Sequence, residues 1–310
     1  MTDIIITEFM DEVAVASLSA RHVTLYDPKL VDDPARLALL LPEARALIVR
    51  NRTQVRGALL EAGRKLEVVG RLGVGLDNID VPACTENGIA VIPATGANDL
   101  SVAEWVIASA MLLLRGAYHS TPEVIAGAWP RNKLMGRELS GRIMGLVGFG
   151  SIAREVAKRA RALGMDVMAH DPFVADHDPA WSLARPHGLE PLLREADVIS
   201  LHVPLTEATR NMIDALRISR MRPDAIILNA SRGGVIDEHA LAAALKKGRL
   251  AGAALDVFEE EPLNAAQGAV FAGCPNLILT PHIAGVTIES NIRVSNLIAA
   301  KVLEHLDRKA

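Results

Sequence analysis

The chain has 310 residues, 50% of them hydrophobic and 3% aromatic, and a formal net charge of −4 at pH 7. This length favours two domains, the hydrophobic content excludes intrinsic disorder, and the acidic balance offers no basic surface for nucleic acid or an anionic membrane. The longest apolar stretch, residues 106–114, is too short to span a bilayer, and the N-terminus lacks the basic region of a secretion signal. The two cysteines match no metal-site spacing. We therefore expect a metal-free α/β protein of the cytoplasm.

The first hundred residues alternate short apolar runs with helical patterns. Strands are predicted over residues 3–7, 46–49 and 67–69, and helices over residues 33–41 and 55–62. Strands that alternate with helices predict crossover connections and a parallel sheet.

A second series of strands begins near residue 143. Six apolar runs are predicted as strands, at residues 143–147, 166–169, 197–201, 225–228, 251–255 and 277–279. With helices between them, these runs predict a doubly wound parallel sheet. A last helix, from about residue 286 to 306, follows the complete sheet. We expect it to pack on the N-terminal domain, so that the chain crosses between domains near residues 98 and 283.

A glycine-rich loop follows the first strand of the second series. Residues 148–153 fit the pattern G-x-G-x-x-G/A, with an apolar strand before and a helix after. The first glycine would permit a sharp turn, and the second would let the backbone approach a pyrophosphate at the N-terminus of the helix. The candidate cofactor contacts of this loop are Gly148, Phe149, Gly150, Ser151 and Ile152.

An acidic residue supports the same interpretation. Asp171 lies 21 residues after Gly150, at the end of the next predicted strand. In dinucleotide-binding folds an acid about 20 residues after the loop binds the adenosine ribose, and its charge disfavours the extra phosphate of NADP. By itself Asp171 could simply end a strand. Together with the loop, it predicts a site for NAD.

Three further strand ends carry reactive side chains. His282 follows the run 277–279, Arg232 follows 225–228, and three acids at 259–261 follow 251–255. Ligands bind at the carboxyl edge of open α/β sheets. There, an arginine can bind a carboxylate, an imidazole can exchange a proton, and an acid can orient the imidazole. Position alone would equally suit a structural histidine, and we expect Glu259 and Glu260 to be solvated.

The chain resembles the D-2-hydroxyacid dehydrogenase family over nearly its whole length. The segments that carry the resemblance are 69–80, 145–153, 229–234, 254–262 and 281–285. The resemblance implies two Rossmann-like domains: a doubly wound NAD-binding domain (residues 99–283) inserted in a smaller, flavodoxin-like substrate-binding domain (residues 1–98 and 284–310). It also implies that Arg232 binds the substrate, that His282 is the acid/base paired with Glu261, and that the chain forms homodimers through the cofactor domains.

Further site residues follow from the resemblance. Besides the loop and Asp171, the expected cofactor contacts are His202, Pro204, Thr209, Ala230, Ser231, Arg232, Asp256, His282 and Gly285. The expected substrate contacts are Arg50, Arg71, Val74, Gly75, Asn98 and Arg131, the last reaching the substrate of a neighbouring subunit.

Within the family, the chain is similar to short 3-phosphoglycerate dehydrogenases and to sulfolactate dehydrogenases. Three arginines among the expected substrate contacts indicate a small 2-hydroxy acid with a second anionic group, such as 3-phosphoglycerate. Sulfolactate, or reduction of hydroxypyruvate or glyoxylate, is the alternative.

Three other classes of protein agree less well with these residues. An NAD-sensing binding protein similar to the C-terminal-binding corepressors would not need the catalytic set. A methyltransferase would explain Asp171 but not Arg232, Glu261 and His282. A formate dehydrogenase would carry glutamine in place of Glu261.

Overall fold

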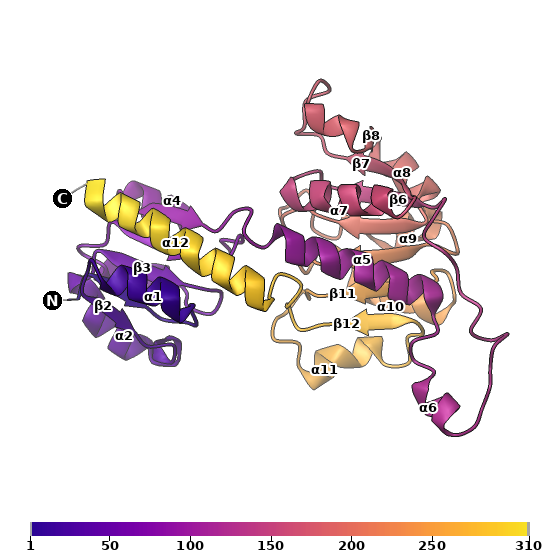
Figure 1. Ribbon diagram of the computed structural model, residues 1–310, viewed down its shortest axis with the longest axis horizontal. Coiled ribbons are helices and arrows are strands. Elements are labelled where there is room, and N and C mark those ends of the chain that lie inside the picture. The colour runs from indigo at the N-terminus through magenta and orange to yellow at the C-terminus, as the bar shows by residue number, and fades with distance from the viewer. Residues whose placement is uncertain (1, 309–310) are drawn as a thin grey trace. The chain divides into compact units, whose positions relative to one another are not determined.

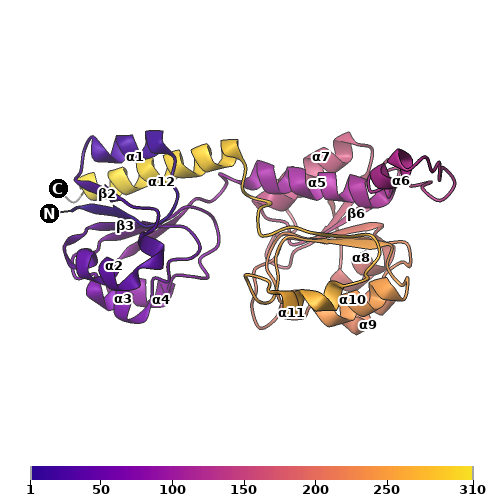
Figure 2. The same ribbon diagram turned by 90° about the horizontal axis from the view of Figure 1, so that it is seen from below.

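The computed structural model describes residues 2–308 and divides the chain into two compact units. Unit 1 comprises the chain up to Asn98 together with the residues from Val286 onward, and unit 2 comprises Asp99–Gly285. Each unit is a parallel β-sheet covered by helices on both faces (Figures 1 and 2). The predicted α/β class with two Rossmann-like units is confirmed. Within the described residues, no helix is long and apolar enough to cross a membrane.

Unit 1 has a five-stranded sheet in the order β2-β1-β3-β4-β5, the flavodoxin-like order. Figure 2 shows helices α1 and α12 on one face of this sheet and α2, α3 and α4 on the other. The strands are β1 (Ile4–Ile6), β2 (Thr24–Tyr26), β3 (Ala46–Val49), β4 (Val68–Arg71) and β5 (Ala90–Pro93). The helices are α1 (Glu12–Ser19), α2 (Pro34–Leu40), α3 (Gly57–Ala62), α4 (Val81–Glu86) and α12 (Ile288–Arg308).

The strands β2 and β5 were not predicted, because each is short and only partly buried and therefore carries little of the hydrophobic signal of a core strand. The last helix, α12, packs on the sheet of unit 1. Its residues Ile298 and Val302 are fully buried against β4, where Gly70 leaves them room. A Cβ atom at Gly70 would lie 2.7 Å from Cγ2 of Ile298.

Unit 2 has a seven-stranded sheet in the order β12-β11-β10-β9-β6-β7-β8, with every pair of strands parallel. The strands are β6 (Ile143–Val147), β7 (Asp166–His170), β8 (Arg185–Pro186), β9 (Val198–Leu201), β10 (Ile226–Asn229), β11 (Gly252–Leu255) and β12 (Leu277–Leu279). The chain leaves β6 toward β7 and β8 and then returns to β9 on the other side of β6. The order therefore reverses between β6 and β9, where such sheets bind their ligands.

Helices cover both faces of this sheet. Figure 2 shows α5 and α7 on one face and α8, α9, α10 and α11 on the other. The helices are α5 (Asp99–Arg115), α6 (Thr121–Ile125), α7 (Ser151–Ala162), α8 (Leu189–Glu195), α9 (Ala215–Arg220), α10 (Glu238–Lys246) and α11 (Ala265–Gly268). Six strands were predicted here, and the structure adds β8. This edge strand has two residues, one of them proline, so the sequence shows no alternating pattern for it.

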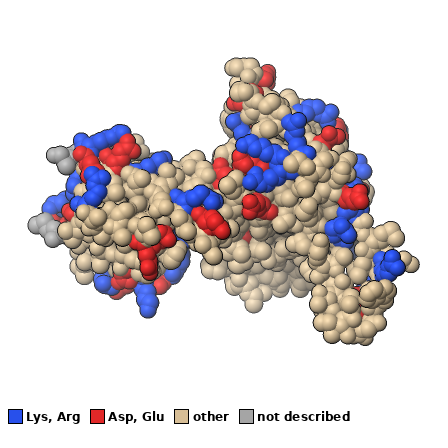
Figure 3. Space-filling model, viewed as in Figure 1, with Lys and Arg blue, Asp and Glu red and all other residues tan. Residues whose placement is uncertain are grey.

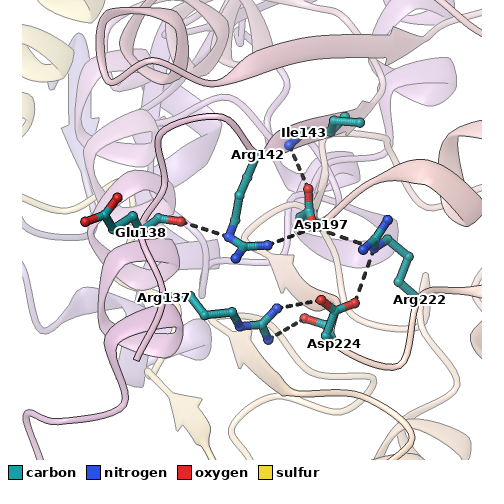
Figure 4. Close-up of polar contacts among 7 residues, drawn as sticks. All are labelled: Arg137, Glu138, Arg142, Ile143, Asp197, Arg222 and Asp224. Carbon is teal, nitrogen blue, oxygen red and sulfur yellow. Dashed lines mark hydrogen bonds and ion pairs between the residues drawn. The ribbon is translucent and has the colours of Figure 1, made fainter. Parts of the chain in front are cut away.

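A network of ion pairs joins the amino ends of three strands of unit 2 (Figure 4). Asp197, which precedes β9, accepts hydrogen bonds from the backbone N–H of Ile143 at 2.9 Å and from Nη1 of Arg142 at 3.1 Å. Arg222 lies between Asp197 and Asp224, and Arg137 donates to the Asp224 carboxylate at 2.8 Å. The network thus fixes the starts of β6, β9 and β10, at the opposite sheet edge from their carboxyl ends.

We predict that Asp197→Ala lowers the free energy of unfolding by about 2–3 kcal/mol, because it leaves the backbone N–H of Ile143 without its acceptor and removes one carboxylate partner each from Arg142 and Arg222. Urea unfolding measures this loss. Asp224→Ala is the matched control: its side chain is 42% exposed, and the expected loss is below about 1 kcal/mol. Equal losses for the two variants would contradict the prediction.

Candidate active site

The glycine-rich loop connects β6 to α7 at the point where the strand order reverses. Gly148 has φ +89°, and a Cβ atom there would lie 2.3 Å from the carbonyl oxygen of His202, so no larger residue fits. A Cβ atom at Gly150 would meet nothing within 4 Å, and none of the described side chains caps α7. The first backbone N–H groups of α7, including those of Ser151 and Ile152, are therefore open to an anion such as a pyrophosphate.

Phe149 takes part in this loop only through its backbone. Its side chain is fully buried, and its ring stacks on Trp181 with 5.0 Å between centroids. The guanidinium of Arg154 lies 5.6 Å from the same ring. The aromatic ring is thus part of the core that supports the loop, and the expected contact of Phe149 with a cofactor stays a prediction.

Asp171 holds the glycine-rich loop from the end of β7. Its Oδ2 accepts the backbone N–H of Phe149 at 2.8 Å, and its Oδ1 accepts that of Phe173 at 2.9 Å. Each carboxylate oxygen keeps a second lone pair that could accept a ribose hydroxyl. The residue therefore combines the negative charge expected of an NAD site with a fixed position.

The loop after β9 carries three further candidates for cofactor contact. Nε2 of His202 lies 2.9 Å from Oγ of Ser200, and burial lowers the pKa of His202 to about 4. Its imidazole is therefore neutral near pH 7. The hydroxyl of Thr209 donates to the carbonyl of Pro204 at 2.6 Å, and this hydrogen bond closes the turn between the two residues.

Arg232 lies on a turn that is held by hydrogen bonds to the side chain of Asn229, the last residue of β10. The Asn229 side chain is buried; its Oδ1 accepts the N–H and the hydroxyl of Ser231 at 3.0 and 2.8 Å, and its Nδ2 donates to the carbonyl of Arg232 at 2.9 Å. Ala230 lies inside this turn. The residue after Arg232 must be glycine, because a Cβ atom at Gly233 would lie 1.7 Å from the carbonyl oxygen of Phe258.

Asp256 fixes the loop that carries His282. Its carboxylate is 1% exposed and accepts the backbone N–H groups of Ile283 and Ala284 at 2.9 and 2.8 Å, besides the hydroxyl of Thr280. Its carbonyl accepts the N–H of His282 at 2.8 Å. Since this carboxylate is occupied within the chain, its expected contact with the cofactor stays a prediction. The loop ends at Gly285, where unit 2 ends.

His282 and Glu261 form a close pair at this edge. Nδ1 of His282 lies 2.6 Å from Oε2 of Glu261, and Oε1 of Glu261 accepts the backbone N–H of Phe258 at 3.0 Å. Partial burial by itself would raise the pKa of Glu261, but the hydrogen bond from His282 and the positive charges of His282 and Arg232 outweigh it and hold this pKa below its usual value. The carboxylate is thus ionised and orients the imidazole.

The other nitrogen of His282 is left for chemistry. The side chain is 43% exposed, and no residue of the range 2–308 bonds to Nε2. An imidazole held at Nδ1 and open at Nε2 is the arrangement that a general acid/base needs. Glu259 and Glu260 are exposed, as expected.

The sequence did not single out three residues that support this edge. Asn229 builds the turn of Arg232, Thr280 donates to Asp256, and Glu238 accepts the backbone N–H of Glu259 at 2.7 Å. The only signal in the sequence is that Asn229 and Thr280 are polar residues directly after apolar strand residues. For Glu238, on α10, the sequence gives no signal.

Most of the expected substrate contacts lie together in unit 1. Arg50 follows β3 and Arg71 ends β4, and these neighbouring parallel strands place both residues at the carboxyl edge of the sheet. The guanidinium of Arg71 lies across Gly73, where a Cβ atom would be 1.3 Å from its Nη1. Within residues 2–308, no group accepts the backbone N–H of Val74 or Gly75, so both are open to a carboxylate.

Two other expected substrate contacts differ from these. Oδ1 of Asn98 is buried and has no hydrogen-bond partner among the described residues, so it could accept a hydrogen bond from a ligand. Arg131 belongs to unit 2, on an exposed segment that includes α6 and projects from the flanking helices of that unit (Figure 1). Arg131 therefore does not share the sheet edge of Arg50 and Arg71.

Among residues 2–308, no group of three or more histidine, cysteine, aspartate or glutamate residues could hold a metal ion. The candidate site instead combines an anion-binding helix N-terminus, an acid for a ribose, an arginine and a paired histidine, all at the carboxyl edge of one sheet.

Known proteins are similar to this chain in sequence and in fold. Residues 107–284 match the family described as "D-isomer specific 2-hydroxyacid dehydrogenase, NAD binding domain". The chain is 55% identical to a (S)-sulfolactate dehydrogenase of Chromohalobacter salexigens over an alignment of 311 positions that covers all of both chains. It is 36% identical to a D-3-phosphoglycerate dehydrogenase of Synechocystis over 99% of this chain, which spans about half (54%) of that protein.

A solved structure agrees in fold over nearly the whole chain. D-lactate dehydrogenase from Aquifex aeolicus, crystallised with NAD and lactic acid, superposes with a TM-score of 0.85 at 28% identity and covers 99% of this chain and 96% of its own. The chain therefore belongs to the D-isomer specific 2-hydroxyacid dehydrogenase family and is an NAD-dependent oxidoreductase that acts on a small 2-hydroxy acid.

Proposed function

We propose that this dehydrogenase interconverts sulfolactate and 3-sulfopyruvate with NAD(H). The support for this substrate is the 55% identity to a (S)-sulfolactate dehydrogenase over the full length of both chains, against 36% to the D-3-phosphoglycerate dehydrogenase. The sequence alone favoured 3-phosphoglycerate as the substrate, whereas the comparisons favour the sulfolactate alternative. Phosphate and sulfonate would use the same arginines, so the choice between them does not alter the proposed chemistry.

The observation that supports this chemistry best is the pair of His282 and Glu261, 2.6 Å apart. We assign Nε2 of His282 the transfer of a proton to or from the oxygen on the substrate's second carbon. Glu261 stabilises the imidazolium that forms when this nitrogen takes the proton. Arg232 binds the substrate carboxylate and polarises the adjacent carbonyl.

The residues around the glycine-rich loop fit NAD, because Gly150 faces open space at a helix N-terminus and Asp171 is held beside it. When bound, NAD supplies the hydride acceptor, and NADH the hydride donor, of the reaction. The loop residues 148–152 would bind its pyrophosphate, and Asp171 its adenosine ribose. Further contacts would come from His202, Pro204, Thr209, Ala230, Ser231, Asp256 and Gly285.

We assign the second anionic group of the substrate to Arg50 and Arg71 of unit 1. A guanidinium presents paired N–H donors that match the oxygens of a sulfonate or a phosphate. The open N–H groups of Val74 and Gly75 suit a carboxylate, and Asn98 offers its unpaired Oδ1.

A homodimer belongs to the same proposal. The segment from residue 116 to 136 exposes Tyr118, Ile125, Trp129 and Met135, which are 61–81% exposed. Figure 3 shows the region around α6 as mostly uncharged surface. An apolar segment of this kind indicates a protein–protein contact. We assign it to a second copy of the chain, to which Arg131 would also be presented.

The dimer is tested by light scattering. We expect the wild type to have twice the mass of one chain, and the double variant Trp129→Ser, Met135→Ser to lose half of that mass. Leu39→Ser, at a residue that is 83% exposed in unit 1, is the control and should stay dimeric. A monomeric wild type would refute this part of the proposal.

The role of His282 is tested by His282→Ala. We predict a loss of about 10²–10⁴ in kcat, the usual range for removal of a general acid/base, with the affinity for NADH nearly unchanged. Stopped-flow reduction and NADH fluorescence titration measure the two quantities. His177→Ala, at an exposed histidine of the same unit, should behave as wild type. Unchanged turnover of the His282 variant would rule out its assigned role.

The substrate is tested by NADH consumption with 3-sulfopyruvate, 3-phosphohydroxypyruvate, hydroxypyruvate, glyoxylate and pyruvate. We expect kcat/KM for 3-sulfopyruvate to exceed that for glyoxylate by about 10–100-fold, since a charged hydrogen bond contributes about 1.5–3 kcal/mol. NADPH should be the poorer cofactor because of Asp171. A preference for glyoxylate or hydroxypyruvate would discard the second anion site, and NADH binding without any turnover would favour an NAD-sensing protein.

A further inference from the structure

Glu8 is a buried carboxylate that the proposed chemistry does not use. It follows β1 and is 5% exposed. Its Oε1 accepts the backbone N–H groups of Arg50 at 2.9 Å and Thr53 at 3.1 Å. Its Oε2 accepts those of Asn51 at 3.3 Å and Arg52 at 3.2 Å. Four successive N–H groups of the loop after β3 therefore point at one carboxylate.

Converging backbone N–H groups of this kind form a nest that binds anions. Here the chain fills the nest with its own side chain, so these N–H groups are not available to a substrate. The loop is also held at its carbonyl groups, because Nδ2 of Asn78 donates to the carbonyl oxygens of Arg50 at 3.4 Å and of Thr53 at 2.7 Å. The hydroxyls of Thr7 and Thr53 are 2.8 Å apart.

The filled nest fixes the backbone of Arg50, from which its side chain extends. Nη2 of Arg50 donates to Oδ1 of Asn291, on α12, at 2.8 Å. Burial lowers the pKa of Arg50, and the nearby charge of Glu8 opposes this effect. Arg50 is thus held at two points: Asn291 of α12 accepts a hydrogen bond from one guanidinium nitrogen, and Glu8 accepts one from the backbone N–H. The other guanidinium nitrogens remain able to donate.

We propose that Glu8 is a positioning residue that sets the preference for a substrate with a second anionic group. By occupying the four N–H groups, Glu8 keeps the loop from binding anions through its backbone and presents the Arg50 guanidinium as the group that meets the substrate's second anion. The inference rests on the assignment of Arg50 in the proposed function. Glu8 itself touches neither the substrate nor the cofactor.

Glu8→Ala empties the nest and tests the proposal. We expect KM for 3-sulfopyruvate to rise at least tenfold, while kcat and the KM for glyoxylate, which lacks a second anion, stay within about twofold. A tenfold change corresponds to about 1.4 kcal/mol. Formate, a small carboxylate that can refill the nest, should restore KM for 3-sulfopyruvate in the variant and leave the wild type unchanged. Glu12→Ala, at an exposed glutamate of α1, is the matched control.

Thermal unfolding provides a readout that does not depend on activity. Formate should raise Tm of Glu8→Ala and not that of the wild type. If Glu8→Ala does not fold, Glu8→Gln serves instead, since its amide oxygen can still accept two N–H groups while its NH2 group cannot accept the other two. Glu8→Asp, which keeps the carboxylate, should retain more of the preference than Glu8→Gln.

The outcomes separate the two proposals. A preserved preference in the Glu8 variants, an equal rise of KM for both substrates, or no effect of formate would overturn the role of Glu8 while leaving the proposed function intact. A wild type that does not prefer 3-sulfopyruvate to glyoxylate would overturn the second-anion assignment, and with it the selectivity role of Glu8. The Tm response to formate would then still report whether the nest binds anions.

Discussion

The geometry of the candidate active site depends on the buried carboxylate of Asp256. It lies at the end of β11 and accepts two backbone N–H groups from the loop after β12. The same loop holds His282 at φ +54°, in the left-handed region that non-glycine residues adopt infrequently, although asparagine, aspartate and histidine are enriched there. Hydrogen bonds of the loop to Asp256 offset this cost. They hold the backbone of His282 where its imidazole lies 2.6 Å from Glu261.

The same solution recurs at other strand ends of the molecule. Asn229 holds the turn that carries Arg232, and Glu8 holds the loop that carries Arg50. In each case a buried polar side chain directly after or at the end of a strand takes up the backbone N–H groups of a loop. A loop held in this way can present a charged side chain in one conformation, which a site for a small ligand requires.

The sequence could predict those features that depend on local order along the chain. Gly148, Asp171, Arg232 and His282 each follow an apolar run, and parallel strands bring their carboxyl ends to one edge. Features that depend on pairing between distant segments could not be predicted. Glu8 and Arg50 are 42 residues apart, and only the pairing of β1 with β3 makes them neighbours.

Short or ambiguous segments account for the other differences. The strand β8 has two residues, too few to show any periodicity. Phe149 has a place in the glycine-rich motif, but the motif does not say that its ring points into the core against Trp181. Three arginines predicted a second anion on the substrate, yet a guanidinium binds sulfonate and phosphate alike. The choice between these acids therefore needed comparison with full-length relatives.

The charges at the carboxyl edge of unit 1 bear on that choice. Arg50 and Arg71 contribute two positive charges there, and Glu8 contributes one negative charge from within the edge. A phosphate carries about −1.5 to −2 near pH 7, whereas a sulfonate carries a single negative charge. The Glu8 carboxylate repels a doubly charged phosphate more strongly than a singly charged sulfonate, so its charge at this edge favours the sulfonate. Glu8 would then contribute twice to specificity: it positions Arg50, and its charge disfavours the more highly charged acid.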